Sequence, residues 1–215
     1  MKLKPVWPAI IALVLSGASA FAADASSLKP PAGAQVAVVV FEDLECPSCA
    51  KAYPMVWETA NSQHVPVMLY DFPLRQHPWS LEAAVDARYF DTKSQKLGDD
   101  FRGYIYENQP NITMQNLHDY VQKFGDEHQT PLPFAVDPEG KLKEKIEADR
   151  SLGEKAGLVH TPTVFVIGRA NGPTPFVEVT DMDKLGQEIE NMKQKVGPAA
   201  PAKAAHTAKH RKKAS

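Results

Sequence analysis

Two cysteines separated by two residues are the part of this sequence best suited to do chemistry. Cys46 and Cys49 are the only cysteines among 215 residues, and they form the segment Cys46-Pro47-Ser48-Cys49. A disulfide stabilises a fold chiefly by closing a loop in the unfolded chain, so a bond across two intervening residues would add little stability. The spacing therefore predicts a redox-active pair, with Pro47 and Ser48 as the residues of its motif.

A metal site is another use for such a pair. Zinc bound through one Cys-x-x-Cys needs two further ligands, and the histidines of this chain show no paired metal-ligand spacing. The sequence therefore predicts neither a metal nor a cofactor. A binding module in which the cysteines hold a metal stays open as an alternative.

The first residues predict export. Lys2 and Lys4 supply positive charge, residues 10–15 are apolar, and Ala20-Phe21-Ala22 has the small-x-small pattern of a cleavage site. The apolar stretch is shorter than the about 20 residues that a membrane helix needs. We expect a signal peptide over residues 1–22 and a mature protein in the periplasm or another extracytoplasmic compartment, where disulfides persist.

Charge is distributed unevenly along the chain. The net charge is −2; the loss of Lys2 and Lys4 with the signal peptide makes it −4, and five cations in residues 197–215 leave −9 for residues 23–196. An acidic body argues against nucleic-acid binding. The tail is rich in Ala, Pro and Lys, so we expect it to be disordered, either without a specific role or in contact with anionic lipid or cell wall.

The strand and helix signals begin around the cysteine pair. Residues 36–41 form the unbroken apolar run of a strand that is covered on both faces. A helix is expected to begin at the cysteines, with Pro47 tolerated in its first turn and a bend near Pro54. A second strand over residues 65–70 completes a β-α-β unit, whose two strands would be parallel and joined by a right-handed crossover.

Helical patterns then follow one another from about residue 79 to residue 156. They cover residues 80–90 with Ser80 as the cap, 99–107, a segment capped by Thr113, and residues 138–156.

Strand patterns return at residues 163–167 and 176–179, on either side of an Asn-Gly turn signal, and a last helix follows. The order is β-α-β, a helical insert at about 79–156, then β-β-α, within one domain over residues 23–196. This order predicts an α/β thioredoxin-like fold with a helical insertion.

Three segments of the chain resemble the DsbA-like thioredoxin-fold disulfide oxidoreductases of secreted bacterial proteins. They are residues 41–49 with the cysteine pair, residues 71–78 (Asp-Phe-Pro-Leu-Arg-Gln-His-Pro), and residues 159–163 (Val-His-Thr-Pro-Thr). The resemblance extends over roughly residues 33–195. Cys-x-x-Cys alone is a moderate signal, and Thr161-Pro162 ahead of a strand makes it a strong one.

The resemblance and the positions of these residues predict roles for five of them. Pro162 would follow a cis peptide bond and face the cysteines, leaving the backbone of Thr161 free to pair with an extended substrate segment. Cys46, at a helix N-terminus, would be the attacking thiolate with a lowered pKa, and Cys49 the resolving thiol. His160 is expected in a surface loop, with a position near the thiolate as the alternative.

One position departs from the family pattern. Many relatives carry a buried carboxylate six residues before the first cysteine, where it relays protons to the second; here that residue is Val40. Glu42 shares the strand face of Val40 and is a candidate proton relay, with a solvated acid near the mouth of the site as the alternative. Asp43 and Glu45 would raise the pKa of Cys46 if they lie close to it.

These observations predict an enzyme, an exported thiol–disulfide oxidoreductase that acts as a dithiol oxidase and donates the Cys46–Cys49 disulfide to secreted proteins. A reductase, an isomerase, and a metal-holding or chaperone-like binding module remain alternatives. The resemblance implies exported protein substrates with thiols or disulfides, and a membrane redox partner that is a quinone-linked oxidase or a thiol donor. A monomer is expected, because family isomerases dimerise through an added N-terminal domain and only about a dozen residues of the expected mature chain precede the first strand.

Overall fold

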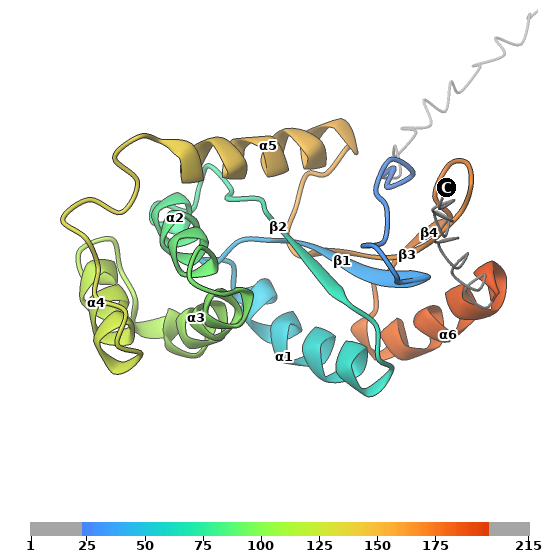
Figure 1. Cartoon of the computed structure of the whole chain (residues 1–215), viewed down its shortest axis with the longest axis horizontal. Helices are drawn as coiled ribbons and strands as arrows, with labels where there is room; N and C mark the ends of the chain where they lie inside the picture. The colour runs from blue at the N-terminus through green and yellow to red at the C-terminus, as the bar shows by residue number, and fades with distance from the viewer. Residues whose placement is uncertain (1–22, 198–215) are drawn as a thin grey trace, which may run out of the picture.

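A four-stranded mixed sheet runs through the middle of the molecule (Figure 1). The computed structural model describes residues 23–197, and the strand order is β2-β1-β3-β4. The strands are β1 Val36–Glu42, β2 Val67–Asp71, β3 Thr163–Gly168 and β4 Phe176–Glu178. Every residue of β1 and β3 is buried, as expected for the two central strands.

The register brings the ends of β1, β2 and β3 to one edge of the sheet. β1 and β2 are parallel, with Glu42 beside Asp71. β1 and β3 are antiparallel, with Phe41 beside Thr163, and β3 pairs antiparallel with β4. The residues that follow β1 and precede β3 are therefore neighbours, although more than 100 positions separate them in the sequence.

Helices cover both faces of the sheet. α1 (Pro47–Ser62) and α6 (Leu185–Val196) lie on one face, and α5 (Lys141–Lys155) lies on the other (Figure 1). Alternate residues of β1 point into the two cores: Val36, Val38 and Val40 pack toward α1 and α6, whereas Ala37, Val39 and Phe41 pack on the opposite side.

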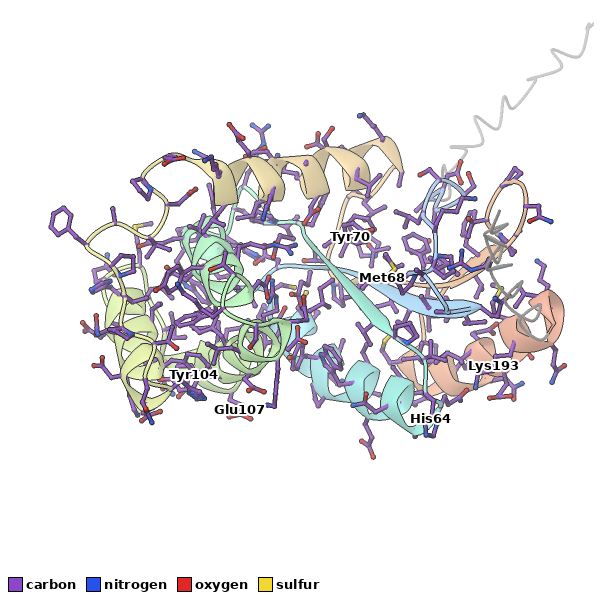
Figure 2. The ribbon with its side chains drawn as sticks, in the orientation of Figure 1. His64, Met68, Tyr70, Tyr104, Glu107 and Lys193 are labelled. Atoms are coloured by element: carbon purple, nitrogen blue, oxygen red, sulfur yellow. The ribbon has the colours of Figure 1, made fainter. Side chains whose placement is uncertain are left out.

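Side-chain contacts tie the outer parts of the fold to the sheet and to each other. The ring of Tyr70, on the edge strand β2, stacks on Phe41 with centroids 5.0 Å apart. Lys193 Nζ on α6 donates a hydrogen bond to the carbonyl oxygen of Gln63, 3.2 Å away. Gln63 follows the last residue of α1 and precedes His64 (Figure 2).

The helical insert has a hydrophobic core of its own. It contains α2 (Ser80–Asp91), α3 (Gln95–Asn108), a short 3-10 turn (Gln109–Asn111) and α4 (Leu117–Glu127), with α5 leading back to the sheet. Rings of Phe90, Phe101 and Phe124 pack against each other at its centre, with centroids 4.7 to 5.1 Å apart. Cys46 and Cys49 belong to the same cluster of buried residues, so the insert packs directly on the cysteine pair.

The predicted fold is confirmed: the insert lies between a β-α-β half and a β-β-α half. Two predicted helix caps are wrong. Ser80 is the first residue of α2, but its hydroxyl donates to the carboxylate of Asp43 and caps nothing. α4 begins at Leu117, after Thr113, whose backbone N–H donates to the side chain of Asn116. At Ser80 a contact outside the helix competes for the hydroxyl, and at the other helix Asn116 occupies the N-cap position in place of Thr113.

The predicted signal peptide (1–22) and all but the first residue of the predicted basic tail (197–215) lie outside the described residues. Within residues 23–197, none of the helices has the length and apolar character that crossing a membrane requires.

Candidate active site

Helix α1 begins at the cysteine pair. Cys46 is its N-cap residue and has an extended backbone, and Pro47 occupies the first turn, where a missing N–H costs no helical hydrogen bond. Cys49 lies one turn inside the helix, and its backbone N–H donates to the carbonyl of Cys46 at 3.0 Å. Both cysteines are free thiols, and their residues are 6 % and 2 % exposed. The local sequence thus places two sulfurs at the positive end of a helix.

The pKa of Cys46 is lowered to about 5. The main cause is a hydrogen bond from the Cys49 thiol; the Thr161 side chain and the backbone N–H groups of Cys49 and Ser48 lower the pKa further, and burial opposes them. The buried Thr161 hydroxyl has no hydrogen-bond partner among residues 23–197, so it is free to turn toward the thiolate. At neutral pH Cys46 is therefore a thiolate.

The pKa of Cys49 is shifted in the opposite direction. Burial raises it most, and the hydrogen bond to Cys46 and the charges of Cys46 and Glu42 raise it further. Two thiols with opposite shifts can divide the work of thiol–disulfide exchange, one as an ionised nucleophile and one as a protonated thiol.

The predicted cis bond between Thr161 and Pro162 is confirmed. The Cys46 sulfur lies 3.4 Å from the carbonyl oxygen of Thr161, to which it donates a hydrogen bond when it is protonated, so the segment before β3 lies against the reactive sulfur. Pro162 lines a narrow enclosed cavity together with Cys49 and Glu42. The loop thus closes the site from the side of the sheet opposite to the insert.

Asp43 fixes the loop that leads from β2 into the insert. Its carboxylate accepts hydrogen bonds from the backbone N–H of Leu74 at 2.7 Å and the hydroxyl of Ser80 at 2.5 Å. Nδ1 of His77 lies 2.7 Å from the same carboxylate. Two members of the segment 71–78 that resembles the family, Leu74 and His77, thus meet at one buried acid.

The Glu45 carboxylate, like that of Asp43, contacts the segment that leads into the insert. Its carboxylate accepts a hydrogen bond from the backbone N–H of Trp79 at 2.7 Å. Neither Asp43 nor Glu45 is among the main influences on the pKa of Cys46, which hydrogen bonds dominate. The expectation that these acids would hold that pKa up is therefore wrong, because both are turned toward loop and helix donors.

Glu42 is buried, which contradicts the alternative of a solvated acid at the mouth of the site. Oε1 accepts from Nε of Arg102 at 3.0 Å, and Oε2 accepts from the hydroxyl of Tyr106 at 3.0 Å. Burial raises the pKa of Glu42 to about 7, against the lowering influence of the Arg102 charge. Glu42 can therefore gain and lose a proton near neutral pH, beside the cavity that Cys49 also lines.

Arg102 connects Glu42 to a wider cluster of charges. Its side chain is fully buried, and it donates two hydrogen bonds to Asp91, at 2.9 and 3.0 Å. Arg88 in turn pairs with Asp71, Asp91 and Asp149. No sequence signal pointed to Arg102 or Tyr106, because a polar or charged residue within an amphipathic helix pattern is normally placed on the solvent side.

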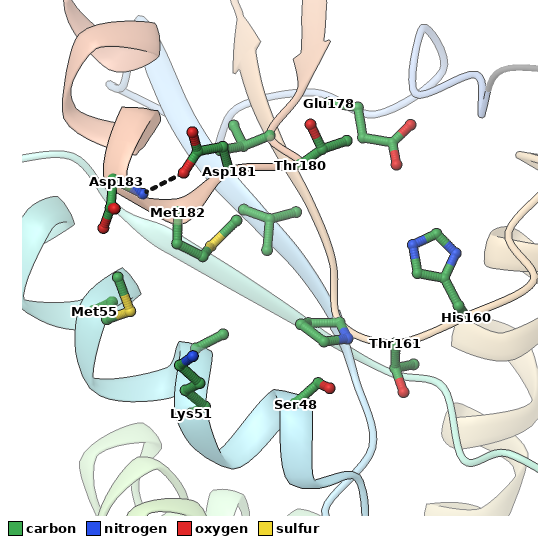
Figure 3. Close-up of a pocket in the computed structure, with 14 residues that line it drawn as sticks. Ser48, Lys51, Met55, His160, Thr161, Glu178, Thr180, Asp181, Met182 and Asp183 are labelled. Atoms are coloured by element: carbon green, nitrogen blue, oxygen red, sulfur yellow. Dashed lines mark hydrogen bonds between the residues drawn. The ribbon is translucent and has the colours of Figure 1, made fainter.

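An open groove of about 550 Å³ lies beside the cis-proline loop (Figure 3). One wall is α1, from Ser48 to Met55, and the other is the segment Glu178 to Asp183. His160 is exposed, as expected for a loop residue, and lines the groove beside Thr161. The structure thus gathers all the predicted site residues at one end of the sheet.

The grouping of possible metal ligands bears on the alternative of a metal-holding module. Within residues 23–197, no three side chains of the His, Cys, Asp and Glu type are grouped so that they could hold a metal ion.

Comparison with known proteins places this site in a family context. Residues 32–182 match the family model described as thioredoxin. No curated protein matches the sequence.

Three solved structures illustrate the likeness of fold. The thiol-disulfide exchange protein α-DsbA2 from Wolbachia pipientis is 19 % identical, with a TM-score of 0.58 over 76 % of this chain and 84 % of that one. DsbA2 from Pseudomonas aeruginosa is 16 % identical, with 0.57 over 80 % and 94 %. A periplasmic thioredoxin-like protein from Salmonella enterica serovar Typhimurium is 16 % identical, with 0.58 over 73 % and 83 %.

Proposed function

The chain belongs to the thioredoxin family of thiol–disulfide oxidoreductases, and we propose that it is an exported dithiol oxidase that donates the Cys46–Cys49 disulfide to secreted proteins. The observation that carries this proposal is the opposite shift of the two sulfurs, an easily ionised Cys46 beside a Cys49 that resists ionisation. The Wolbachia neighbour, a thiol-disulfide exchange protein, supports the reaction class.

The reaction proceeds through two exchanges. A substrate thiolate attacks Cys46 Sγ, the Cys46–Cys49 bond breaks, and Cys49 leaves as a thiolate that takes up one proton. A second substrate thiolate then attacks the substrate sulfur of the mixed disulfide, and Cys46 leaves as a thiolate. The substrate dithiol loses two electrons and two protons; the enzyme gains both electrons and one proton, and solvent takes the other proton.

The low pKa of Cys46 favours this direction of electron flow. Hydrogen bonds to the Cys46 thiolate stabilise the reduced enzyme, and stabilising the reduced form makes a disulfide a stronger oxidant. The same property makes Cys46 a good leaving group in the second exchange, since thiols of lower pKa leave faster.

Glu42 is the proposed proton donor to Cys49. Its raised pKa keeps a substantial fraction protonated at neutral pH, and its carboxyl lines the same narrow cavity as Cys49. A protonated acid beside a departing thiolate acts as a general acid. The carboxylate that many relatives carry at the position of Val40 is replaced here by one two residues later on the same strand face.

The cis-proline loop is the proposed site of substrate binding. The backbone of Thr161 lies against Cys46, where an extended segment that brings a cysteine to the sulfur can add as a strand. The substrates would be exported proteins with thiols, and a membrane redox partner would reoxidise the pair in an extracytoplasmic compartment. The periplasmic Salmonella neighbour supports this location.

The reduction potential of the pair tests the direction. We expect a value well above the about −270 mV of thioredoxin and toward the about −120 mV of DsbA, measured by equilibration with glutathione. The oxidised protein should also form disulfides in a reduced, unfolded substrate. A potential near that of thioredoxin, with ready reduction of insulin by the reduced protein, would instead assign a reductase.

A further inference from the structure

The groove beside the cis-proline loop carries more acid than base. Glu178 lies on the same side as His160, and Asp181 and Asp183 lie at the other end, next to Met182 (Figure 3). The charged and titratable groups that line it are three carboxylates, the ammonium of Lys51 on the α1 wall, and the imidazole of His160.

Two of the three carboxylates are free to bind a ligand. Asp181 accepts a hydrogen bond from the backbone N–H of Asp183 at 3.2 Å and pairs with Lys184 at 3.3 Å. The side chains of Glu178 and Asp183 have no hydrogen-bond or ion-pair partner among residues 23–197. Both are therefore available to a positive charge that enters the groove.

The rest of the lining is apolar. Met55 on α1 and Met182 on the facing wall approach each other across the groove, and Val164, Val179 and Pro162 complete the lining (Figure 3). A lysine or arginine side chain suits such a surface, because its alkyl stem can lie on methionine while its charged end reaches a carboxylate.

We propose that this groove selects substrate segments that carry a lysine or arginine close to the reacting cysteine, with Glu178 and Asp183 as the specificity-determining residues. The inference rests on the proposed function, since it concerns the substrate of the same site. A segment that pairs with the Thr161 backbone beside Cys46 has to run along this groove, which begins at Thr161 and Pro162.

The expected selectivity is that of partly exposed charge pairs. Each carboxylate should contribute roughly a two- to five-fold preference for a basic over a neutral neighbour. The preference should fall steeply between low ionic strength and about 1 M salt, where the screening length is about 3 Å. Lys51 should oppose it, because its ammonium repels the same side chain.

The test uses three otherwise identical peptides with two cysteines, whose residues next to the first cysteine are lysine, glutamine or glutamate. Disulfide formation by the oxidised protein is followed by chromatography. If the protein acts as a reductase, the oxidised peptides and the reduced protein are used in the same way. We expect the order lysine, glutamine, glutamate from fastest to slowest at low salt, and convergence of the three rates at high salt.

Variants assign the selectivity to the groove. Glu178→Gln and Asp183→Asn should each lower the ratio of the lysine to the glutamate rate, and Lys51→Gln should raise it. The control is Glu147→Gln, which removes an exposed acid on α5, on the opposite face of the sheet.

The outcomes separate this inference from the proposed function. Equal rates for the three peptides, or a preference that survives the Glu178→Gln, Asp183→Asn double variant, would overturn the groove assignment while thiol exchange stands. No exchange with any peptide in either direction would instead overturn the proposed function, and the selectivity would fall with it.

Discussion

Arg102 and Glu42 form an ion pair with Nε and Oε1 3.0 Å apart, and neither side chain is more than 2 % exposed. Glu42 ends the first strand, and Arg102 comes from the middle of the helical insert. The pair joins the acid beside Cys49 to the helix that also supplies Tyr106, the second hydrogen-bond donor to that acid. Its consequences for proton transfer, stability and folding can each be measured.

Substitution of the two cysteines should separate their roles. Cys46→Ser should abolish thiol–disulfide exchange, because the sulfur that is easily ionised is lost. Cys49→Ser should retain a reactive Cys46 and accumulate mixed disulfides with substrates, because the resolving thiol is absent. Non-reducing gels and mass spectrometry of adducts measure both. A Cys49→Ser protein that reacts with alkylating agents but traps no substrate would contradict this division.

Glu42→Gln should slow the step in which Cys49 gains or loses its proton. The loss expected for a general acid or base is about 100-fold. The wild-type rate should show an inflection near pH 7, where the carboxyl of Glu42 titrates, and the variant should lack it. Single-turnover rates between pH 5 and pH 9 are the measurement. Glu147→Gln serves as the control, and an unchanged inflection in Glu42→Gln would remove Glu42 from the mechanism.

Stability should fall as the pH rises, because buried carboxyls bind protons more tightly in the folded chain than in the unfolded one. Burial raises the pKa of Asp86 from 3.8 to about 8, with a further rise from the charge of Glu82. Because the folded-state pKa is raised, the stabilisation from this carboxyl is fully present below the unfolded pKa near 4. It is lost progressively as the pH rises to about 8.

Asp86→Asn tests that pH dependence directly, since asparagine resembles the protonated acid. The variant should be more stable than wild type at pH 8 by at least about 1.4 kcal/mol, the equivalent of one pKa unit, and should gain little at pH 4. Urea unfolding at both pH values measures the difference. Asp119→Asn, at an exposed position of α4, is the matched control. Equal gains at pH 4 and pH 8 would exclude a titrating Asp86.

Arg102→Met should destabilise the protein by about 3 to 5 kcal/mol, because it leaves Glu42 and Asp91 buried without their cation. The loss should be smaller at low pH, where the carboxyls can be protonated. Arg150→Met, which breaks the more exposed pair with Glu154, should cost no more than about 1 kcal/mol. Denaturant midpoints provide the comparison. Losses of similar size would show that the buried Arg102 pair contributes no more to stability than the more exposed Arg150 pair.

A milder variant keeps the charge cluster intact. Tyr106→Phe removes one hydrogen bond from Glu42 without a change of charge, so it should fold and should shift the inflection near pH 7 upward. The shift is expected because that hydrogen bond lowers the pKa of Glu42. The pH profile separates this effect from a purely structural one, which would change the stability and leave the inflection in place.

The sequence was sufficient where local patterns decide structure. The run before the cysteines and Pro47 in the first turn each depend on the chemistry of their immediate neighbours, and the structure agrees with the predicted strand and helix. The cis bond at Thr161-Pro162, which the family resemblance implied, is also present. The order of elements then leaves few topologies to choose from.

The sequence was not sufficient where distant segments meet. Whether Glu42 is solvated or buried depends on Arg102 and Tyr106, which lie 60 and 64 residues further along the chain. The same holds for Asp43 and Glu45, whose partners are donors of the loop and helix that enter the insert. Charge near a thiol can be read from a sequence, but the direction in which a carboxylate turns cannot.

The packing of the cysteine pair into the core of the insert makes the two parts of the chain inseparable. Cys46 and Cys49 share one cluster of buried side chains with Phe90, Phe101 and Leu117, and the insert also supplies the cation beside Glu42. Grafting this insert onto another thioredoxin scaffold would transfer the groups that shift the pKa of the buried acid as well as the helices themselves. A chimera would therefore take the cation and the hydroxyl that tune the buried acid from the insert, and the acid itself and the two sulfurs from the scaffold.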